Sequence, residues 1–112
     1  MESERFDTIL KNLKDYIGPA RFGGESMELN AGLHFTGGEP FLRYDLLLEA
    51  SQRAAGYGIP SLFVESNCFW AKDDDKVRSR FSELKNAGLV GILISVNPFY
   101  LEYIPFDRTE RA

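Results

Sequence analysis

The chain has 112 residues, which is enough for one domain over residues 1–112. Its hydrophobic content of 44% and aromatic content of 13% predict a packed core and argue against disorder. The net charge of −4 comes without a basic stripe, which argues against nucleic-acid binding, and no apolar run approaches the ~18 residues of a membrane span. The N-terminal residues lack a signal-peptide pattern, so we expect a cytoplasmic protein without a membrane or nucleic-acid partner.

The first predicted element is an amphipathic helix over residues 3–16, followed by a long connection. Its apolar side chains recur at helical spacing, at Phe6, Ile9, Leu10, Leu13, Tyr16 and Ile17. Gly18 and Pro19 end this helix. Residues 20–32 mix glycines with polar residues and predict a loop, with a short strand at 27–29 as the weaker alternative.

Three short apolar segments predict strands. They span residues 33–36, 61–66 and 89–96, and each is bounded by glycine, proline or polar residues. The second and third are apolar nearly throughout, which is typical of strands covered on both faces. Because helical patterns separate the three segments, the sequence predicts an α/β fold with a parallel sheet joined by helical crossovers.

Two further helices are predicted between these strands. Pro40 suits the first turn of a helix that continues over 41–55. The next helix begins at Asp73 or Asp74 and ends near residue 86, so we interpret the acidic run as a favourable helix N-terminus rather than a metal site. Residues 97–112 contain aromatics and prolines and predict a loop.

Polar side chains follow all three predicted strands. Because the carboxyl ends of parallel strands meet at one edge of a sheet, where α/β proteins bind ligands, these residues are expected to lie close together. Gly37 and Gly38 permit a tight turn and close approach of a ligand to the backbone, and Glu39 offers a negative group to a cation such as an amine. The alternative is a strand-to-helix turn without a ligand. The segment lacks the features of a phosphate-binding P-loop or a dinucleotide fingerprint.

The segment "FTGGEPFL" resembles the GGEP motif of the radical S-adenosylmethionine (radical SAM) superfamily, which contacts the amino group of that cofactor. The segment "FVESNCF" is similar to the third strand and its exit, where the family often has Thr-Asn-Gly, and "GILISVNPF" to the fourth strand, near the cofactor ribose. The resemblance implies a fragment of a partial (β/α)6 TIM-like barrel, from its first helix through its fourth strand. The implied cofactor-binding residues are Gly37, Gly38, Glu39, Pro40, Glu65, Asn67, Ser95 and Asn97.

The sequence departs from this family in its cysteines. Family members hold a 4Fe–4S cluster with three cysteines in C-x-x-x-C-x-x-C, and the cluster reduces S-adenosylmethionine to a 5′-deoxyadenosyl radical. This chain has one cysteine, Cys68, which matches none of the three and is expected to be a buried, packed residue. No catalytic residue or metal ligand is therefore assigned, and the chain alone is expected to be inactive, with unpaired strand edges that favour self-association.

Two alternatives to this interpretation remain open. One is a non-catalytic, truncated α/β module with residual ligand binding or none, and the other is an unrelated small α/β domain in which GGEP is only a turn. His34 is interpreted as a packed strand residue. Trp70 has two equal interpretations, as the roof of a substrate cavity or as cover for a strand end.

Overall fold

The computed structural model describes residues 3–21, 23, 27–29, 31–100 and 102–112. In chain order the elements are α1 (Ser3–Leu13), β1 (Leu33–Phe35), the 3-10 helix η1 (Pro40–Arg43), α2 (Tyr44–Gly56), β2 (Leu62–Ser66), α3 (Asp74–Asn86), β3 (Leu89–Ile94), the 3-10 helix η2 (Pro98–Tyr100) and α4 (Phe106–Arg111). Among the described residues, no helix combines the length and the apolar character needed to cross a membrane.

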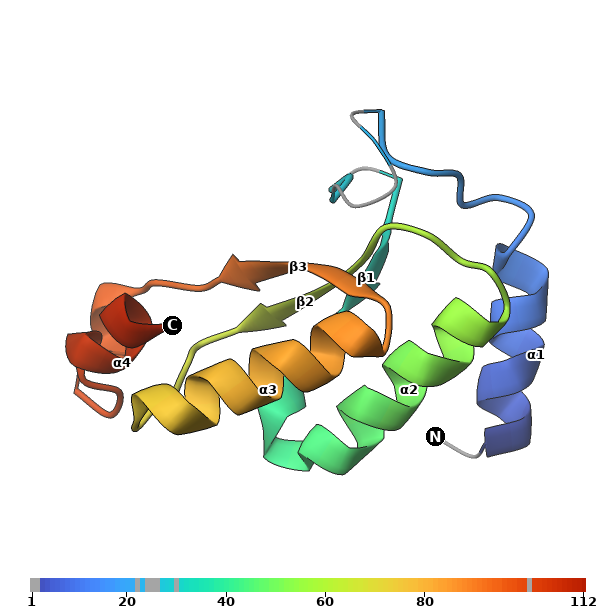
Figure 1. The fold of residues 1–112 in the computed structure, drawn as a ribbon. Coiled ribbons are helices and arrows are strands. Elements are labelled where there is room, and N and C mark those ends of the chain that lie inside the picture. The colour runs from blue at the N-terminus through green and yellow to red at the C-terminus, as the bar shows by residue number, and fades with distance from the viewer. Residues whose placement is uncertain (1–2, 22, 24–26, 30, 101) are drawn as a thin grey trace.

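The three strands form one parallel sheet in the order β1-β2-β3. Leu33 pairs with Leu62, and Leu62 pairs in turn with Leu89, so the three strands start at the same level of the sheet. Their carboxyl ends therefore share one edge (Figure 1). The predicted α/β fold and the parallel pairing are both confirmed.

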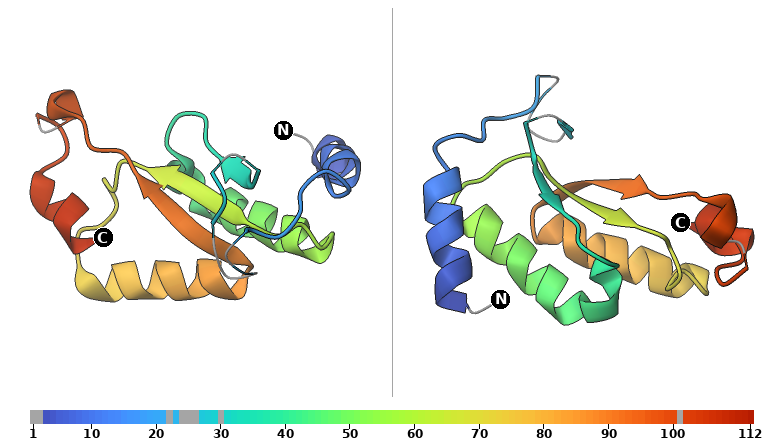
Figure 2. Two further views of the ribbon diagram at one scale, coloured as in Figure 1. Left: turned by 90° about the horizontal axis from the view of Figure 1, so that it is seen from above. Right: turned by 180° about the vertical axis from the view of Figure 1, so that it is seen from behind.

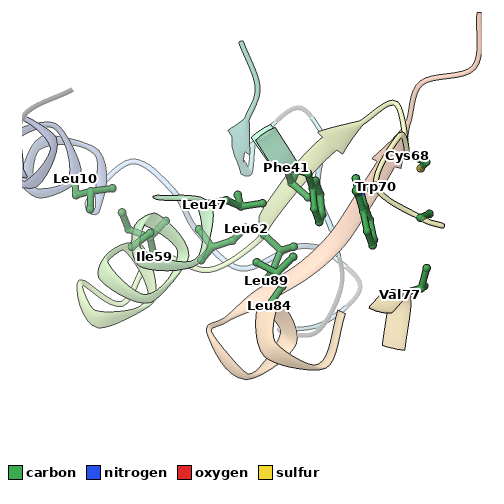
Figure 3. Close-up of a cluster of buried hydrophobic side chains, with 13 residues drawn as sticks. Leu10, Phe41, Leu47, Ile59, Leu62, Cys68, Trp70, Val77, Leu84 and Leu89 are labelled. Carbon is green, nitrogen blue, oxygen red and sulfur yellow. The ribbon is translucent and has the colours of Figure 1, made fainter. Parts of the chain in front are cut away.

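Helices α2 and α3 lie side by side against one face of the sheet (Figures 1 and 2). Leu62 and Val64 of β2 point into this layer and are fully buried, because alternate residues of a strand face opposite sides. Helix α1 packs beyond α2 and contributes Leu10 to the same core. Figure 3 shows the result, a continuous apolar layer that includes the stacked rings of Phe41 and Trp70 and continues to Cys68 and Val77.

The opposite face of the sheet is only partly covered. Phe63 is buried there under the ring of His34, with the two ring centroids 4.5 Å apart. Met27, from the connection before β1, packs so closely over Gly91 that a Cβ at that glycine would stand 2.5 Å from its sulfur. Toward the carboxyl ends, β3 stays half-buried on this side. This face is therefore more covered near the start of the strands than near their carboxyl ends.

Several element boundaries differ from the sequence prediction. Helix α1 ends at Leu13 rather than residue 16, and Tyr16 is 84% exposed in the turn that follows. The helix after β1 begins with a 3-10 turn, in which the N–H of Leu42 bonds the carbonyl of Glu39. Residues 27–29 form no strand. These differences are local and leave the predicted topology unchanged.

The prediction of a loop over residues 97–112 was wrong, because this segment folds into η2 and α4. Helix α4 is attached to the exit of β2 by two arginines. Arg108 donates to the carbonyl of Phe69 at 2.8 Å, and Arg111 donates to the carbonyl of Ala71 at 2.9 Å. Helix formation here thus depends on tertiary partners that lie far away in the sequence.

The acidic run before α3 has the capping role that the sequence predicts. Asp73 is the N-cap, and its carboxylate accepts a hydrogen bond from the N–H of Lys76 at 2.7 Å. Asp74 and Asp75 occupy the first turn, where negative charge is favourable with the helix dipole.

Candidate functional site

The carboxyl end of β1 turns sharply into η1. Gly37 and Gly38 have φ angles of 95° and 68°, in the left-handed region that favours glycine. Nothing lies within 4 Å of the position that a Cβ would take on either residue, so both border open space. Glu39 then caps η1 by accepting a hydrogen bond from the N–H of Phe41 at 3.2 Å, and Pro40 occupies the first turn. The turn leaves backbone accessible beside a carboxylate.

The Glu39 carboxylate ties the exit of β1 to the exit of β2. Its Oε1 accepts a hydrogen bond from the hydroxyl of Ser66 at 2.9 Å, in addition to the bond from Phe41. Its Oε2 accepts the backbone N–H of Asn67 at 2.7 Å. The carboxylate is therefore held by three donors from two separate strand exits, which fixes its orientation.

Ser66 is the centre of this arrangement and was missed by the sequence prediction. It is 1% exposed, and its Oγ accepts hydrogen bonds from the backbone N–H of Cys68 and from Nε1 of Trp70, both at 3.0 Å. The indole of Trp70 stacks on Phe41, with centroids 4.2 Å apart and planes inclined by 7°. Trp70 thus covers the strand end and belongs to the core, which decides between its two interpretations.

Cys68 is buried, as predicted, in a left-handed backbone conformation with φ of 64°. Burial raises the pKa of its thiol to about 11, and the negative charge of Glu39 adds to this shift. A thiol of this kind stays protonated near neutral pH and is a poor nucleophile and metal ligand.

A second polar cluster lies on the open face of the sheet. The hydroxyl of Ser95 donates to Glu65 Oε1 at 2.6 Å, and Nε2 of His34 lies 3.4 Å from Glu65 Oε2. His34 Nε2 is shielded from solvent and has no hydrogen-bond partner among the described residues. Its contact with Glu65 is an ion pair only when the imidazole is protonated. The cluster therefore spans all three strand ends.

The two predicted asparagines shape the loops in which they lie. Asn67 Oδ1 accepts the N–H of Phe69 at 3.1 Å, and Asn97 Oδ1 accepts the N–H of Phe99 at 2.9 Å. Both are side-chain turns that Asn favours at strand exits. Their side-chain oxygens are thus used locally, while the backbone N–H of Asn67 serves Glu39.

A cavity of about 350 Å³ lies beside the β1 exit, between α1 and α2. Of the predicted site residues, Gly37, Glu39 and Pro40 line it, whereas Asn67 and Asn97 lie outside its lining. The remaining lining residues are Ser3, Phe6, Phe35, Thr36, Arg43, Leu46, Leu47, Glu49, Ala50 and Arg53. The cavity is thus mainly apolar, and Glu39 is one of the residues that border it.

The eight predicted residues therefore fall into separate groups rather than one site. Glu39 accepts the backbone N–H of Asn67 directly on the helix-covered side, next to its bond from Ser66. Glu65 and Ser95 meet on the open face, together with His34. Ser66 and His34 were not predicted as site residues, although Ser66 lies in the sequence between the predicted Glu65 and Asn67.

No family model matches the chain, and no curated protein matches its sequence.

Proposed function

We propose that this chain is a fragment of a radical SAM enzyme and forms the part of its partial (β/α)6 barrel that binds S-adenosylmethionine. In this proposal Glu39 receives the ammonium group of the methionine moiety, and Gly37 and Gly38 lie against it. The observation that carries the proposal is the Glu39 carboxylate, which is fixed between two strand exits, in a residue that borders the cavity of about 350 Å³.

The free acceptor capacity of Glu39 supports an ammonium ligand. A carboxylate offers about four acceptor positions, and three are used, two on Oε1 and one on Oε2. One position on Oε2 is left for an additional donor. A charged hydrogen bond of this kind contributes about 1.5–3 kcal/mol, which is about tenfold or more in affinity.

The backbone at the exit of β2 also supports the resemblance. Cys68 occupies the position where radical SAM proteins often have the glycine of Thr-Asn-Gly, and its φ of 64° is a conformation that glycine adopts most easily. A non-glycine residue in this conformation indicates that the surrounding contacts fix the shape of the turn, which also presents the Asn67 N–H to Glu39.

The residues of this chain do not fit an iron–sulfur cluster. The sequence contains one cysteine, and its thiol is buried with a pKa raised to about 11. Within the part of the chain that the structure describes, no group of three or more His, Cys, Asp or Glu side chains is arranged to hold a metal ion. We therefore assign no redox step to these residues and limit the proposal to cofactor binding.

The second candidate function is a non-catalytic α/β module in which Glu39 is only a structural clamp. This candidate is favoured by the same three hydrogen bonds, since each oxygen of the carboxylate already has a protein partner. The two candidates differ in one measurable property, which is whether the carboxylate binds a ligand.

Isothermal titration calorimetry of the 112-residue chain with S-adenosylmethionine separates the two candidates. We expect saturable binding that Glu39→Gln weakens by about tenfold or more, because the charged acceptor is lost. The matched control is Glu49→Gln, which removes the same charge from the α2 wall of the same cavity. We expect that control to stay within about twofold of the wild type.

Two results would contradict the proposal. The first is no binding to the folded wild-type chain, which would favour the structural module. The second is equal weakening by Glu39→Gln and Glu49→Gln, which would indicate a general charge effect instead of a contact. Circular dichroism of each variant establishes that it is folded before the titrations are compared.

A further inference from the structure

We propose that Ser66 is a positioning residue that orients the Glu39 carboxylate for its ligand, and that Trp70 reports on the occupancy of that carboxylate. This inference rests on the proposed function, since it concerns the same site. It adds a residue outside the GGEP segment and gives the site an intrinsic spectroscopic probe.

The hydrogen bonds of Ser66 leave its hydroxyl one orientation. A serine hydroxyl has one proton to donate and two lone pairs that accept. Its Oγ accepts hydrogen bonds from two N–H donors, the backbone N–H of Cys68 and the indole N–H of Trp70. These two bonds occupy both lone pairs of the oxygen. The hydroxyl proton must therefore point at Glu39 Oε1, which lies 2.9 Å away.

This fixed donor determines which oxygen of Glu39 meets the ligand. Oε1 receives both Ser66 and the N–H of Phe41, so its acceptor positions are filled. Among the described residues, Oε2 receives only the N–H of Asn67, which leaves one acceptor position for the ligand. Because Ser66 is 1% exposed, water does not compete for its proton. Ser66 thus holds the carboxylate in place before the ligand arrives, which lowers the cost of ordering it on binding.

Trp70 is coupled to the same carboxylate through a single atom. Its indole N–H and the Glu39 carboxylate are bonded to the same oxygen, Ser66 Oγ. Trp70 is 4% exposed, and its indole stacks on the ring of Phe41 (Figure 3). The backbone N–H of Phe41 donates to the Glu39 carboxylate as well. It is the one tryptophan in the sequence, so the emission excited selectively from tryptophan comes from this site alone. A cation that binds Glu39 changes the electric field at the indole and therefore its emission.

The experiment compares four proteins, the wild type, Ser66→Ala, Ser66→Thr and Ser51→Ala. Ser51 provides the matched control because it is also fully buried and donates its hydroxyl, to the carbonyl of Leu47 within α2. Each protein is titrated with S-adenosylmethionine while affinity is measured by calorimetry and Trp70 emission by fluorescence. Thermal unfolding of each protein measures the purely structural effect of the substitution.

We expect Ser66→Ala to weaken binding about fivefold and to reduce the ligand-induced change in Trp70 emission at saturation, because the hydrogen bond from the indole to Ser66 is lost. Ser66→Thr keeps the hydroxyl and should bind within about twofold of the wild type. Ser51→Ala should lower thermal stability and leave both the affinity and the emission change intact. If the role of Ser66 were merely structural, Ser66→Ala would behave in the same way.

The outcomes separate this inference from the proposed function. If the wild type binds and Ser66→Ala binds equally well with the same emission change, the role of Ser66 is refuted and the proposed function stands. If Ser66→Ala does not fold, a folded Ser66→Thr protein that has lost binding refutes the role instead. If the wild type itself does not bind, the proposed function fails and the role of Ser66 fails with it.

Discussion

Replacing Glu39 by alanine removes the acceptor of three hydrogen bonds that join two strand exits. The two shorter bonds, from Asn67 at 2.7 Å and Ser66 at 2.9 Å, are charge-assisted and contribute at least about 1.5 kcal/mol each. The longer bond, from Phe41 at 3.2 Å, is weaker and contributes less. The expected loss in the free energy of unfolding is therefore about 3 kcal/mol, from a domain total of roughly 5–15 kcal/mol.

Urea unfolding monitored by Trp70 fluorescence measures this loss directly, because that indole is buried in the native state. For a slope of about 1.5 kcal/mol per molar urea, the midpoint should fall by about 2 M. The matched control is Glu49→Ala, since Glu49 is a half-exposed glutamate on α2 with a single i,i+4 ion pair. Its midpoint should move by less than about 0.3 M. Equal shifts for the two variants would refute the clamp, since they would show that Glu39 contributes no more than a surface charge.

Two further predictions concern pH and association. The pKa of the Cys68 thiol is about 11 in the folded chain, against its ordinary value of 9.0 in the unfolded chain. The unfolded chain therefore loses this proton first, so the free energy of unfolding should fall as the pH rises from 9 to 11. Cys68→Ala should flatten this fall in urea-unfolding free energies measured across that range, and an unchanged slope would show that the thiol is not responsible. Because β1 and β3 each have an edge that no other described strand pairs with, we expect concentration-dependent self-association in sedimentation velocity. Leu93→Lys, on the open face of β3, should reduce this association, whereas Ile9→Lys on α1 should leave it unchanged. Equal association of the two variants would place the contact away from the sheet.

The parallel sheet could be predicted from the sequence because its signals are local. Apolar segments bounded by glycines marked the strands, and their alternation with helical patterns determined the pairing. The N-cap at Asp73 was likewise readable, since a capping carboxylate binds a backbone N–H three residues away. Features of this kind depend on residues that are close in sequence.

The features that sequence reasoning missed depend on distant contacts. Helix α4 is held by Arg108 and Arg111, which donate to carbonyls 39 and 40 residues earlier in the chain. Ser66 read as the polar end of an apolar strand, and its role emerges only when Glu39, 27 residues earlier, is placed beside it. The grouping of the site residues on two sides of the sheet follows from strand alternation once the register is known. Glu65 and Ser66 are adjacent in sequence but face opposite sides.

The proposed binding of S-adenosylmethionine by Glu39 is tested most directly by ¹⁵N nuclear magnetic resonance. The spectrum of the chain is followed during titration with that cofactor. The account predicts saturable shifts in the backbone amides of Gly37, Gly38 and Asn67 and in the indole N–H of Trp70, all of which are lost in Glu39→Gln. Methionine, which carries the same ammonium group, should move the same signals more weakly. Saturable shifts that avoid these four signals, or the absence of any shift in the folded chain, would contradict the account.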